Sequence, residues 1–362
     1  MRVIFLVDRE IAKIELPMIR TLGIGLVDAG VRTTVALPSD MVDNIHDAFG
    51  FDVVGYRDRG AVWTRGLRAR ELIEAIEPED RESMVIHAFG SKSYALAAEF
   101  ASGTGSALVL EVHARREVSR AGGFVKERHN ATLLLTPSAP LARALIAEGV
   151  SGINVREVPW GVTPAEHMQA HTPGVDFAIV LGGTGSDHHT WASALRGLAA
   201  VAGRREDFLI FADAASMDRA GIDPLVGSLG LSPMLSRVPT LEDKRELALR
   251  ADILIWPDHA GEHHSLVLDA MARGMVVVAS EDSDIPAISD PSRVMVVAGS
   301  ASDWSMAVTS ALEDEGVRTR IGAAARSYIR EHHRVSRHVA GVIEAYEWLT
   351  GRDSIPMDKV SS

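Results

Sequence analysis

The chain contains no cysteine among its 362 residues. Disulfide bonds, thiolate zinc sites and a cysteine nucleophile are therefore excluded. Glycine and proline, at 31 and 15 residues, are too few for a low-complexity or collagen-like chain. Hydrophobic residues make up 46% of the sequence and charged residues 24%, which is typical of a globular protein. A chain of this length favours two domains over one.

Long apolar segments and basic clusters are missing as well. No stretch approaches the roughly 20 apolar residues that a membrane-spanning helix requires. The apolar run at 3–7 is followed at once by charged residues, which indicates a buried strand and not a signal peptide. Lys and Arg are scattered and the formal net charge is −12, so we expect no nucleic-acid partner. We predict a cytoplasmic protein and leave peripheral contact with a membrane open.

Short apolar runs alternate with helical patterns through the first half of the chain. The runs are apolar on nearly every position, which is typical of strands covered on both faces, and lie at 2–7, 33–37, 84–88, 107–112, 132–136 and 155–158. Segments with apolar residues at helical spacing lie between them at 17–29, 93–101 and 139–148. This alternation predicts an α/β domain with a doubly wound parallel sheet.

The second half repeats this organisation after a segment of little periodicity. We predict an N-terminal Rossmann-like domain over 1–162, a linker over 163–174, a C-terminal Rossmann-like domain over 175–331, a C-terminal helix over 332–351 that returns to the first domain, and a frayed tail over 352–362. The strands of the second domain are predicted at 177–181, 208–212, 251–256, 275–279 and 294–297, and its helices at 190–202, 224–229 and 265–273. Helical patterns continue over 304–313 and 318–349, with a break near His332–Arg334.

The most informative segment, 257–286, follows a predicted strand, enters a helix near Ser265 and leaves it through Gly274. In open parallel sheets, ligands bind beyond the carboxyl ends of the strands. A helix N-terminus at this edge can hold a phosphate, because its first backbone N–H groups have no partner within the helix. Glu262 and Asp269 bracket the first turns, where carboxylates suit sugar hydroxyls. The alternative is that Glu262 only offsets the helix dipole and that Asp269 is solvated.

This segment resembles the glycosyltransferases of the GT-B fold, and among them the large retaining family 4. That family carries the signature E-x7-E running into AMAxGxPVVA, and this chain has Glu262 followed by DAMARGMVVVAS at 269–280. The similarity extends over nearly the whole chain. In the first domain it includes IHAFG at 86–90, LEVHA at 110–114 and PWGV at 159–162. The resemblance implies two Rossmann-like domains facing each other across a cleft.

The resemblance also implies an activity. A sugar would pass from a nucleotide-sugar donor, held by the second domain, to an unknown acceptor hydroxyl on the first domain. Anomeric configuration would be retained, without a metal or other cofactor. His113 would face the reacting centre, while Glu262 and Asp269 would contact the sugar and the ribose of the donor. The backbone N–H groups that would hold the diphosphate belong to His264, Ser265 and Leu266.

The donor site departs from the family pattern in two ways. Only six residues separate Glu262 from Asp269, so Gly261 is an alternative occupant of the first carboxylate's position. The loop after the first strand of the second domain also lacks the Arg and Lys that the family places against the diphosphate. The residues of this loop that would still permit close approach of the donor are Gly183, Thr184 and Gly185. Its histidines, His188 and His189, could supply partial positive charge.

The first domain departs from the pattern too. Where the family commonly has a Gly-Gly turn after the first strand, this chain has charged residues. Glu10, Lys13 and Glu15 would meet the acceptor or donor there. The alternative is that these charges merely solvate a loop.

Other interpretations stay open. The altered donor site favours a GT-B-like sugar- or nucleotide-binding protein without transfer activity, and a nucleotide-sugar epimerase of the same fold is a third option. Histidine pairs at 188–189 and 263–264 each lie next to an acid, but adjacent histidines do not easily ligate one metal ion and zinc-motif spacing is absent. Ser138 lacks the GxSxG context of a hydrolase, so we interpret it as a helix cap. The GGTGSD segment does not complete a dinucleotide-binding motif.

Overall fold

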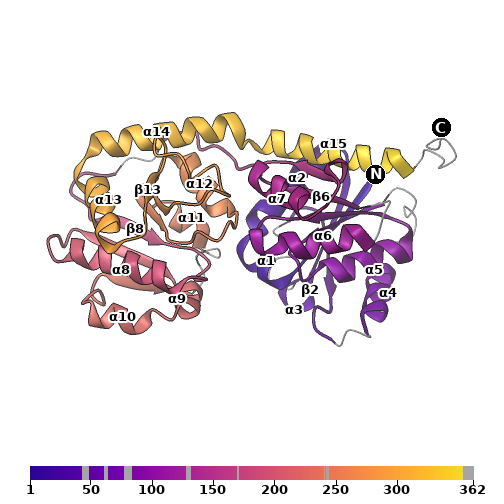
Figure 1. Cartoon of the computed structure of the whole chain (residues 1–362), viewed down its shortest axis with the longest axis horizontal. Coiled ribbons are helices and arrows are strands. Elements are labelled where there is room, and N and C mark those ends of the chain that lie inside the picture. The colour runs from indigo at the N-terminus through magenta and orange to yellow at the C-terminus, as the bar shows by residue number, and fades with distance from the viewer. Residues whose placement is uncertain are drawn as a thin grey trace. The chain divides into compact units, whose positions relative to one another are not determined.

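The computed structural model describes residues 1–42, 49–60, 64–76, 84–127, 132–168, 171–239, 241 and 244–353, apart from the side chains of 352 and 353. The chain forms two compact units (Figure 1). The N-unit is Met1–Gly161 together with the helix that begins at Val335, and the C-unit is Val162–Arg334. Residues 163–174, predicted as a linker, fall within the C-unit, and the predicted tail from residue 354 onward lies outside the described residues.

The N-unit is built on a parallel sheet of seven strands in the order β3-β2-β1-β4-β5-β6-β7. The strands are β1 (Arg2–Val7), β2 (Arg32–Pro38), β3 (Asp52–Tyr56), β4 (Met84–Phe89), β5 (Ala107–Glu111), β6 (Thr132–Thr136) and β7 (Val155–Glu157). The helices are α1 (Arg9–Ile14), α2 (Leu16–Asp28), α3 (Ser39–Val42), α4 (Arg65–Ala75), α5 (Tyr94–Thr104), α6 (Val118–Glu127) and α7 (Ala139–Ala147), with the short 3-10 turns η4 (Arg115–Glu117) and η5 (Gly152–Asn154). Central strands such as β1 are buried at every position, as a sheet covered on both faces requires.

The C-unit repeats the architecture with a parallel sheet of six strands in the order β10-β9-β8-β11-β12-β13. The strands are β8 (Phe177–Leu181), β9 (Phe208–Asp213), β10 (Leu235–Val238), β11 (Ile253–Trp256), β12 (Val276–Ser280) and β13 (Met295–Val297). The helices are α8 (His188–Ala202), α9 (Ala214–Ala220), α10 (Asp223–Ser228), α11 (Arg245–Ala248), α12 (Ser265–Arg273), α13 (Ala301–Glu313) and α14 (Glu315–His332). Two doubly wound parallel sheets are therefore present, and the predicted α/β class is confirmed.

The last helices are separated where the sequence predicts a break. α14 ends at His332 and α15 (Val335–Asp353) begins three residues later. Arg334, between them, forms an isolated parallel bridge with Val162. α15 packs against α2 of the N-unit, which is how the chain returns to its first half (Figure 1).

Two strands escape the sequence analysis, and both lie at sheet edges. β3 carries Gly55 and has only one buried residue, and β10 has two exposed positions between two half-buried ones. Because an edge strand is covered on fewer sides, it does not need the continuous apolar run that marks a central strand. Helices α1, α4 and α6 are also absent from the predicted elements. α4 has a negative mean hydropathy and buries only Ala69 and Leu72.

Candidate functional site

In the described sheet of the C-unit, the strand order reverses between β8 and β11, which is the topological switch point of the sheet. The strands β9 and β10 extend the sheet on one side of β8, and β11, β12 and β13 extend it on the other. In doubly wound sheets, ligands bind at this switch point, beyond the carboxyl ends of the strands. The two loops concerned are 182–187 after β8 and 257–264 after β11. They contain most of the predicted donor-binding residues.

Two glycines shape the loop after β8. Gly183 has φ +149° and Gly185 has φ +70°, which L-residues with side chains rarely adopt. A Cβ atom on Gly183 would collide with the carboxylate of Asp258, and one on Gly185 would collide with the backbone carbonyl of Ser216. The positions flanking Thr184 therefore accept only glycine, and the loop passes close to both neighbours.

Asp258 fastens this glycine loop to the end of β11. Its side chain is buried, and it accepts hydrogen bonds from the backbone N–H of Thr184 and, over 3.0 Å, from the indole Nε1 of Trp191 in α8. The sequence analysis does not single out Asp258. Its signal would have been an acidic residue two positions beyond the end of a fully buried strand, opposite a glycine-rich loop.

The second loop leads into α12, whose N-cap position is His264. Glu262 is buried there, with Oε1 3.6 Å from Nε2 of His264. Just before it, the N–H of Gly261 donates to Oδ2 of Asp282 over 2.8 Å. Burial raises the pKa of Asp282 above the usual aspartate value. A carboxylate thus does lie beside Gly261, but it comes from the loop after β12 and was not predicted.

Asp269, on the second turn of α12, is paired with a buried arginine that the sequence analysis also misses. Oδ2 of Asp269 lies 3.0 Å from Nε and 2.9 Å from Nη2 of Arg245. Nη2 of Arg245 also donates to Oγ of Ser265 over 2.8 Å. Arg245 is the first residue of α11, so one guanidinium fixes the start of α11 against the first two turns of α12.

The predicted donor-binding residues therefore gather at one edge of the C-unit. They occupy the glycine loop and the beginning of α12, and they are Gly183, Thr184, Gly185, Glu262, His264, Ser265, Leu266 and Asp269. His188 is held elsewhere, with Nδ1 2.6 Å from the carbonyl oxygen of Ala220. Among the described residues, no three His, Asp or Glu side chains form a metal-binding group.

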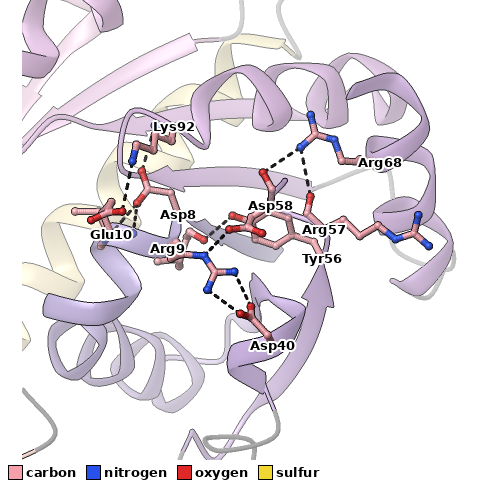
Figure 2. Close-up of polar contacts among 11 residues, drawn as sticks. Asp8, Arg9, Glu10, Asp40, Tyr56, Arg57, Asp58, Arg68 and Lys92 are labelled. Carbon is pink, nitrogen blue, oxygen red and sulfur yellow. Dashed lines mark hydrogen bonds and ion pairs between the residues drawn. The ribbon is translucent and has the colours of Figure 1, made fainter. Parts of the chain in front are cut away.

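The N-unit has its own switch point, between β1 and β4, and a carboxylate lies there as well. Asp8, directly after β1, caps α1 by accepting the N–H groups of Glu10 and Ile11, and its other oxygen accepts the N–H of Lys92 over 3.1 Å (Figure 2). Burial raises the pKa of Asp8 despite these bonds. Gly90, with φ +85°, leaves room for this carboxylate.

Charged side chains surround this switch point. The guanidinium of Arg9 makes two hydrogen bonds to Asp40, over 2.8 and 2.6 Å, and one to Asp58 over 2.6 Å (Figure 2). These contacts lower the pKa of both carboxyl groups. Glu10 is exposed and pairs with Lys92 over 3.4 Å. These charges thus form two separate groups, Arg9 with Asp40 and Asp58 and Glu10 with Lys92, and Arg9 and Glu10 belong to helix α1 and not to a loop.

Lys13 and Glu15 occupy different surroundings although they are two residues apart. Lys13 is exposed in the last turn of α1, as the predicted acceptor-side role requires. Glu15 is fully buried between α1 and α2, where its charge helps to raise the pKa of His113, and its role towards a ligand stays a prediction.

His113, the predicted catalytic residue of the N-unit, follows β5 and is buried. Its Nδ1 lies 2.9 Å from Oε2 of Glu117, which also accepts the His113 backbone N–H over 3.1 Å. The other Glu117 oxygen accepts the N–H of Ser91, in the loop after β4. Burial alone would lower the pKa of His113 and raise that of Glu117, but the mutual attraction outweighs it and shifts both pKa values the other way.

A buried polar network supports His113 from behind. Its ring stacks on Trp160, with centroids 5.7 Å apart, and the indole Nε1 of Trp160 donates to Glu111 over 2.6 Å. Glu111 Oε2 lies 3.2 Å from His87, whose Nδ1 lies 2.7 Å from the hydroxyl of Tyr346 in α15. Burial would raise the pKa of Glu111, but the bonds from His87 and Trp160 lower it. The C-terminal helix α15 is thus connected to Glu111 at the end of β5, two residues before His113.

The fold of this chain matches known structures, although its sequence matches no family model. No family model matches the sequence, and no curated protein matches it significantly. Solved structures do match. Sucrose-phosphate synthase from Thermosynechococcus elongatus has a TM-score of 0.76 at 14% identity, covering 97% of this chain and 100% of that one. HepE of Anabaena, in complex with UDP and glucose, has a TM-score of 0.75 at 13% identity, covering 96% and 100%.

The chain accordingly has the two-sheet α/β fold of GT-B glycosyltransferases. At these identities the likeness establishes the fold and leaves the reaction open. A candidate UDP-N-acetylglucosamine 2-epimerase from Listeria monocytogenes also matches, with a TM-score of 0.61 at 13% identity over 99% of this chain and 98% of that one. None of the described helices is long and apolar enough to cross a membrane.

Proposed function

We propose that this protein is a retaining, metal-independent glycosyltransferase of family 4 that moves a sugar from a nucleotide-sugar to an acceptor hydroxyl. The observation that carries the proposal is the donor edge of the C-unit. There the glycine loop follows β8, and the loop that leads into α12 follows the neighbouring strand β11. Buried Asp258 anchors the glycine loop, so both segments lie at the switch point of the sheet. Backbone N–H groups at such a helix start suit an anionic diphosphate.

Each proposed role is the one that the resemblance to family 4 implies for that position of the chain. The N–H groups of His264, Ser265 and Leu266 would bind the diphosphate and stabilise its charge as it departs, which is the demanding step of the transfer. Buried Glu262 would accept hydrogen bonds from the sugar, and Asp269 from the ribose. Arg245 holds the Asp269 carboxylate in place through Oδ2.

On the N-unit, His113 would contact the reacting sugar. Its Nδ1–H is engaged by Glu117, so Nε2 is the ring atom directed to a substrate. Glu10 and Lys13 would line the acceptor side. UDP is the first nucleotide to consider, because HepE was solved with UDP and glucose. A cytoplasmic location belongs to this proposal, which leaves peripheral contact with a membrane open.

Calorimetry of the whole chain with UDP, GDP, ADP and their sugars, with and without EDTA, tests the donor site. We expect one nucleotide family to bind equally well in both conditions and to raise the melting temperature. Product analysis with an acceptor panel then tests transfer and anomeric configuration. Binding only in the presence of a divalent metal ion, or an inverted product, would contradict the proposed mechanism.

The second candidate is a sugar- or nucleotide-binding protein of this fold without transfer activity. It is favoured by the absence of Arg and Lys from the loop at 182–187 and by glycine at position 261. This candidate predicts nucleotide binding with no product in any acceptor screen. An epimerase would instead alter the nucleotide-sugar with no acceptor present, so product analysis separates all three.

A further inference from the structure

The proposed donor site lacks cations in its glycine loop, although its ligand is strongly anionic. Carboxylates surround the loop: Asp187 caps α8, Asp258 lies beneath Thr184, and Asp213 caps α9. A diphosphate entering here would meet negative charge unless an arginine or lysine from another element compensates for it. The question is which cation of the C-unit is close enough and not already neutralised.

Arg219 in α9 meets both conditions. Its Nη2 donates to Oγ of Ser216 over 3.1 Å, because side chains three residues apart lie on the same face of a helix and lean towards its N-terminus. Oγ of Ser216 lies in turn 2.5 Å from the carbonyl oxygen of Gly183. The guanidinium is therefore two hydrogen bonds away from the glycine loop.

The loop also runs along α9 beyond Ser216. Gly185 passes against the Ser216 carbonyl, and His188 reaches the carbonyl of Ala220, next to Arg219 in sequence. Arg219 thus lies beside the part of the loop that spans 183–188.

Arg219 differs from the neighbouring arginines in its ion pairs with carboxylates. Arg237 is paired with Asp218 and Asp223, and Arg245 is paired with Asp269. Arg219 is exposed, and among the described residues no carboxylate lies within ion-pair distance of it. The hydroxyl of Ser216 engages one of its five N–H donors, and the planar fork of the guanidinium is suited to phosphate oxygens.

We infer that Arg219 contacts the diphosphate of the donor and supplies the positive charge that the glycine loop itself lacks. The inference rests on the proposed donor site and names a residue that the family signature does not provide. Ser216 acts as the positioning residue, because it holds the guanidinium beside Gly183. It is itself held by Oδ2 of Asp213, which accepts its backbone N–H over 2.8 Å and lies 2.5 Å from its hydroxyl oxygen.

The test compares Arg219→Ala with Arg204→Ala, a matched control. Arg204 is also exposed and lies in the same unit, but it follows the C-terminal end of α8, at the opposite edge of the sheet. Both variants change the net charge equally. Binding of UDP, GDP, ADP, the matching nucleosides and inorganic pyrophosphate is measured by calorimetry at two salt concentrations.

We expect Arg219→Ala to weaken binding of the nucleoside diphosphate and of pyrophosphate by about 10- to 100-fold, the effect of losing a charged hydrogen bond. Binding of the nucleoside should not change, and the salt dependence of diphosphate binding should become shallower. Arg219→Lys should recover part of the affinity, because it keeps the charge but loses the fork. Arg204→Ala should match the wild type.

The two proposals fail in different ways. Wild-type affinity for the diphosphate in Arg219→Ala would overturn the role of Arg219 and leave the donor site standing. No binding of any diphosphate by the wild type would overturn both. An equal loss of affinity for nucleoside and diphosphate would also overturn the role, because it would indicate a general disturbance of α9. If the alanine variant does not fold, Arg219→Gln provides the same comparison.

Discussion

Replacing Asp258 by asparagine tests whether one buried carboxylate holds the glycine loop in place. The carboxylate accepts one hydrogen bond from the backbone of Thr184 and one from Trp191, and no cation is paired with it among the described residues. Asparagine has the same shape but only one accepting atom. Its NH₂ group must therefore face one of the two donors, which loses that bond and leaves a buried N–H group without a partner.

The magnitude follows from these two bonds. Each hydrogen bond to a charged group contributes about 1.5–3 kcal/mol, and the lower desolvation cost of a neutral amide offsets part of the loss. We expect Asp258→Asn to lower the free energy of unfolding of the C-unit by about 2–3 kcal/mol. For a domain of this size that corresponds to a drop of roughly 4–12 °C in melting temperature. Nucleotide affinity should fall by about tenfold, because the loop loses its fixed shape.

Calorimetric melting and nucleotide titration of the full chain measure both effects. Asp223→Asn is the control, since it removes an equally charged but exposed partner of Arg237 and should change stability by less than about 1 kcal/mol. If Asp258→Asn melts and binds as the wild type does, the carboxylate does not organise the loop. The reasoning about the donor edge would then lose its anchor.

Two further predictions concern the other buried pairs. In Arg245→Ala, Asp269 and Ser265 lose their guanidinium partner. We therefore expect thermal melts to show a free energy of unfolding about 2–4 kcal/mol lower, and we expect weaker nucleotide binding. Nucleotide binding as strong as in the wild type would indicate a purely structural role for Arg245. Glu117→Gln should lower the free energy of unfolding most between about pH 4.5 and 6.5. These limits are the ordinary pKa values of a glutamate and a histidine, the two members of the pair. The lowered pKa of Glu117 stabilises the fold above pH 4.5 and is lost on acidification, while the raised pKa of His113 stabilises it below pH 6.5 and is lost as the pH rises through that pKa. A difference between variant and wild type that does not vary with pH, in urea melts from pH 3 to 9, would refute the ion pair.

The central strands could be predicted from sequence, and the edge strands could not. β1 and β5 are buried at every position, so packing demands a continuous apolar run. β3 and β10 have one neighbouring strand each and carry polar or glycine positions that do not distinguish them from loops. The alternation of the central elements was enough to predict the fold class, because each doubly wound sheet requires it.

The candidate site divides in a similar way. The loops could be predicted, because parallel strands bring their carboxyl ends to one edge and residues near 183 and 262 follow such ends. The partners of these loops could not. Asp258 lies 74 residues from Thr184, and Arg245 lies 24 residues from Asp269. Neither pairing follows from local periodicity, since it depends on which strands become neighbours and on where a short helix begins.

The shape of the glycine loop bears on the choice between a ligand-binding protein and an inert scaffold. A buried carboxylate whose partners are neutral N–H groups costs desolvation energy, and glycine at φ +70° costs chain entropy on folding. A sheet that needed only stability would gain from an apolar residue at 258 and an ordinary turn at 185. Such locally unfavourable choices concentrate where function requires them. The donor edge therefore favours a ligand at this loop.

The His113–Glu117 pair repeats the argument in the N-unit, because burying two charges stabilises a fold less than apolar packing would. Two costly arrangements, each beyond the carboxyl ends of parallel strands in its own unit, fit the proposed transferase with two substrates. A protein that only binds a nucleotide requires one.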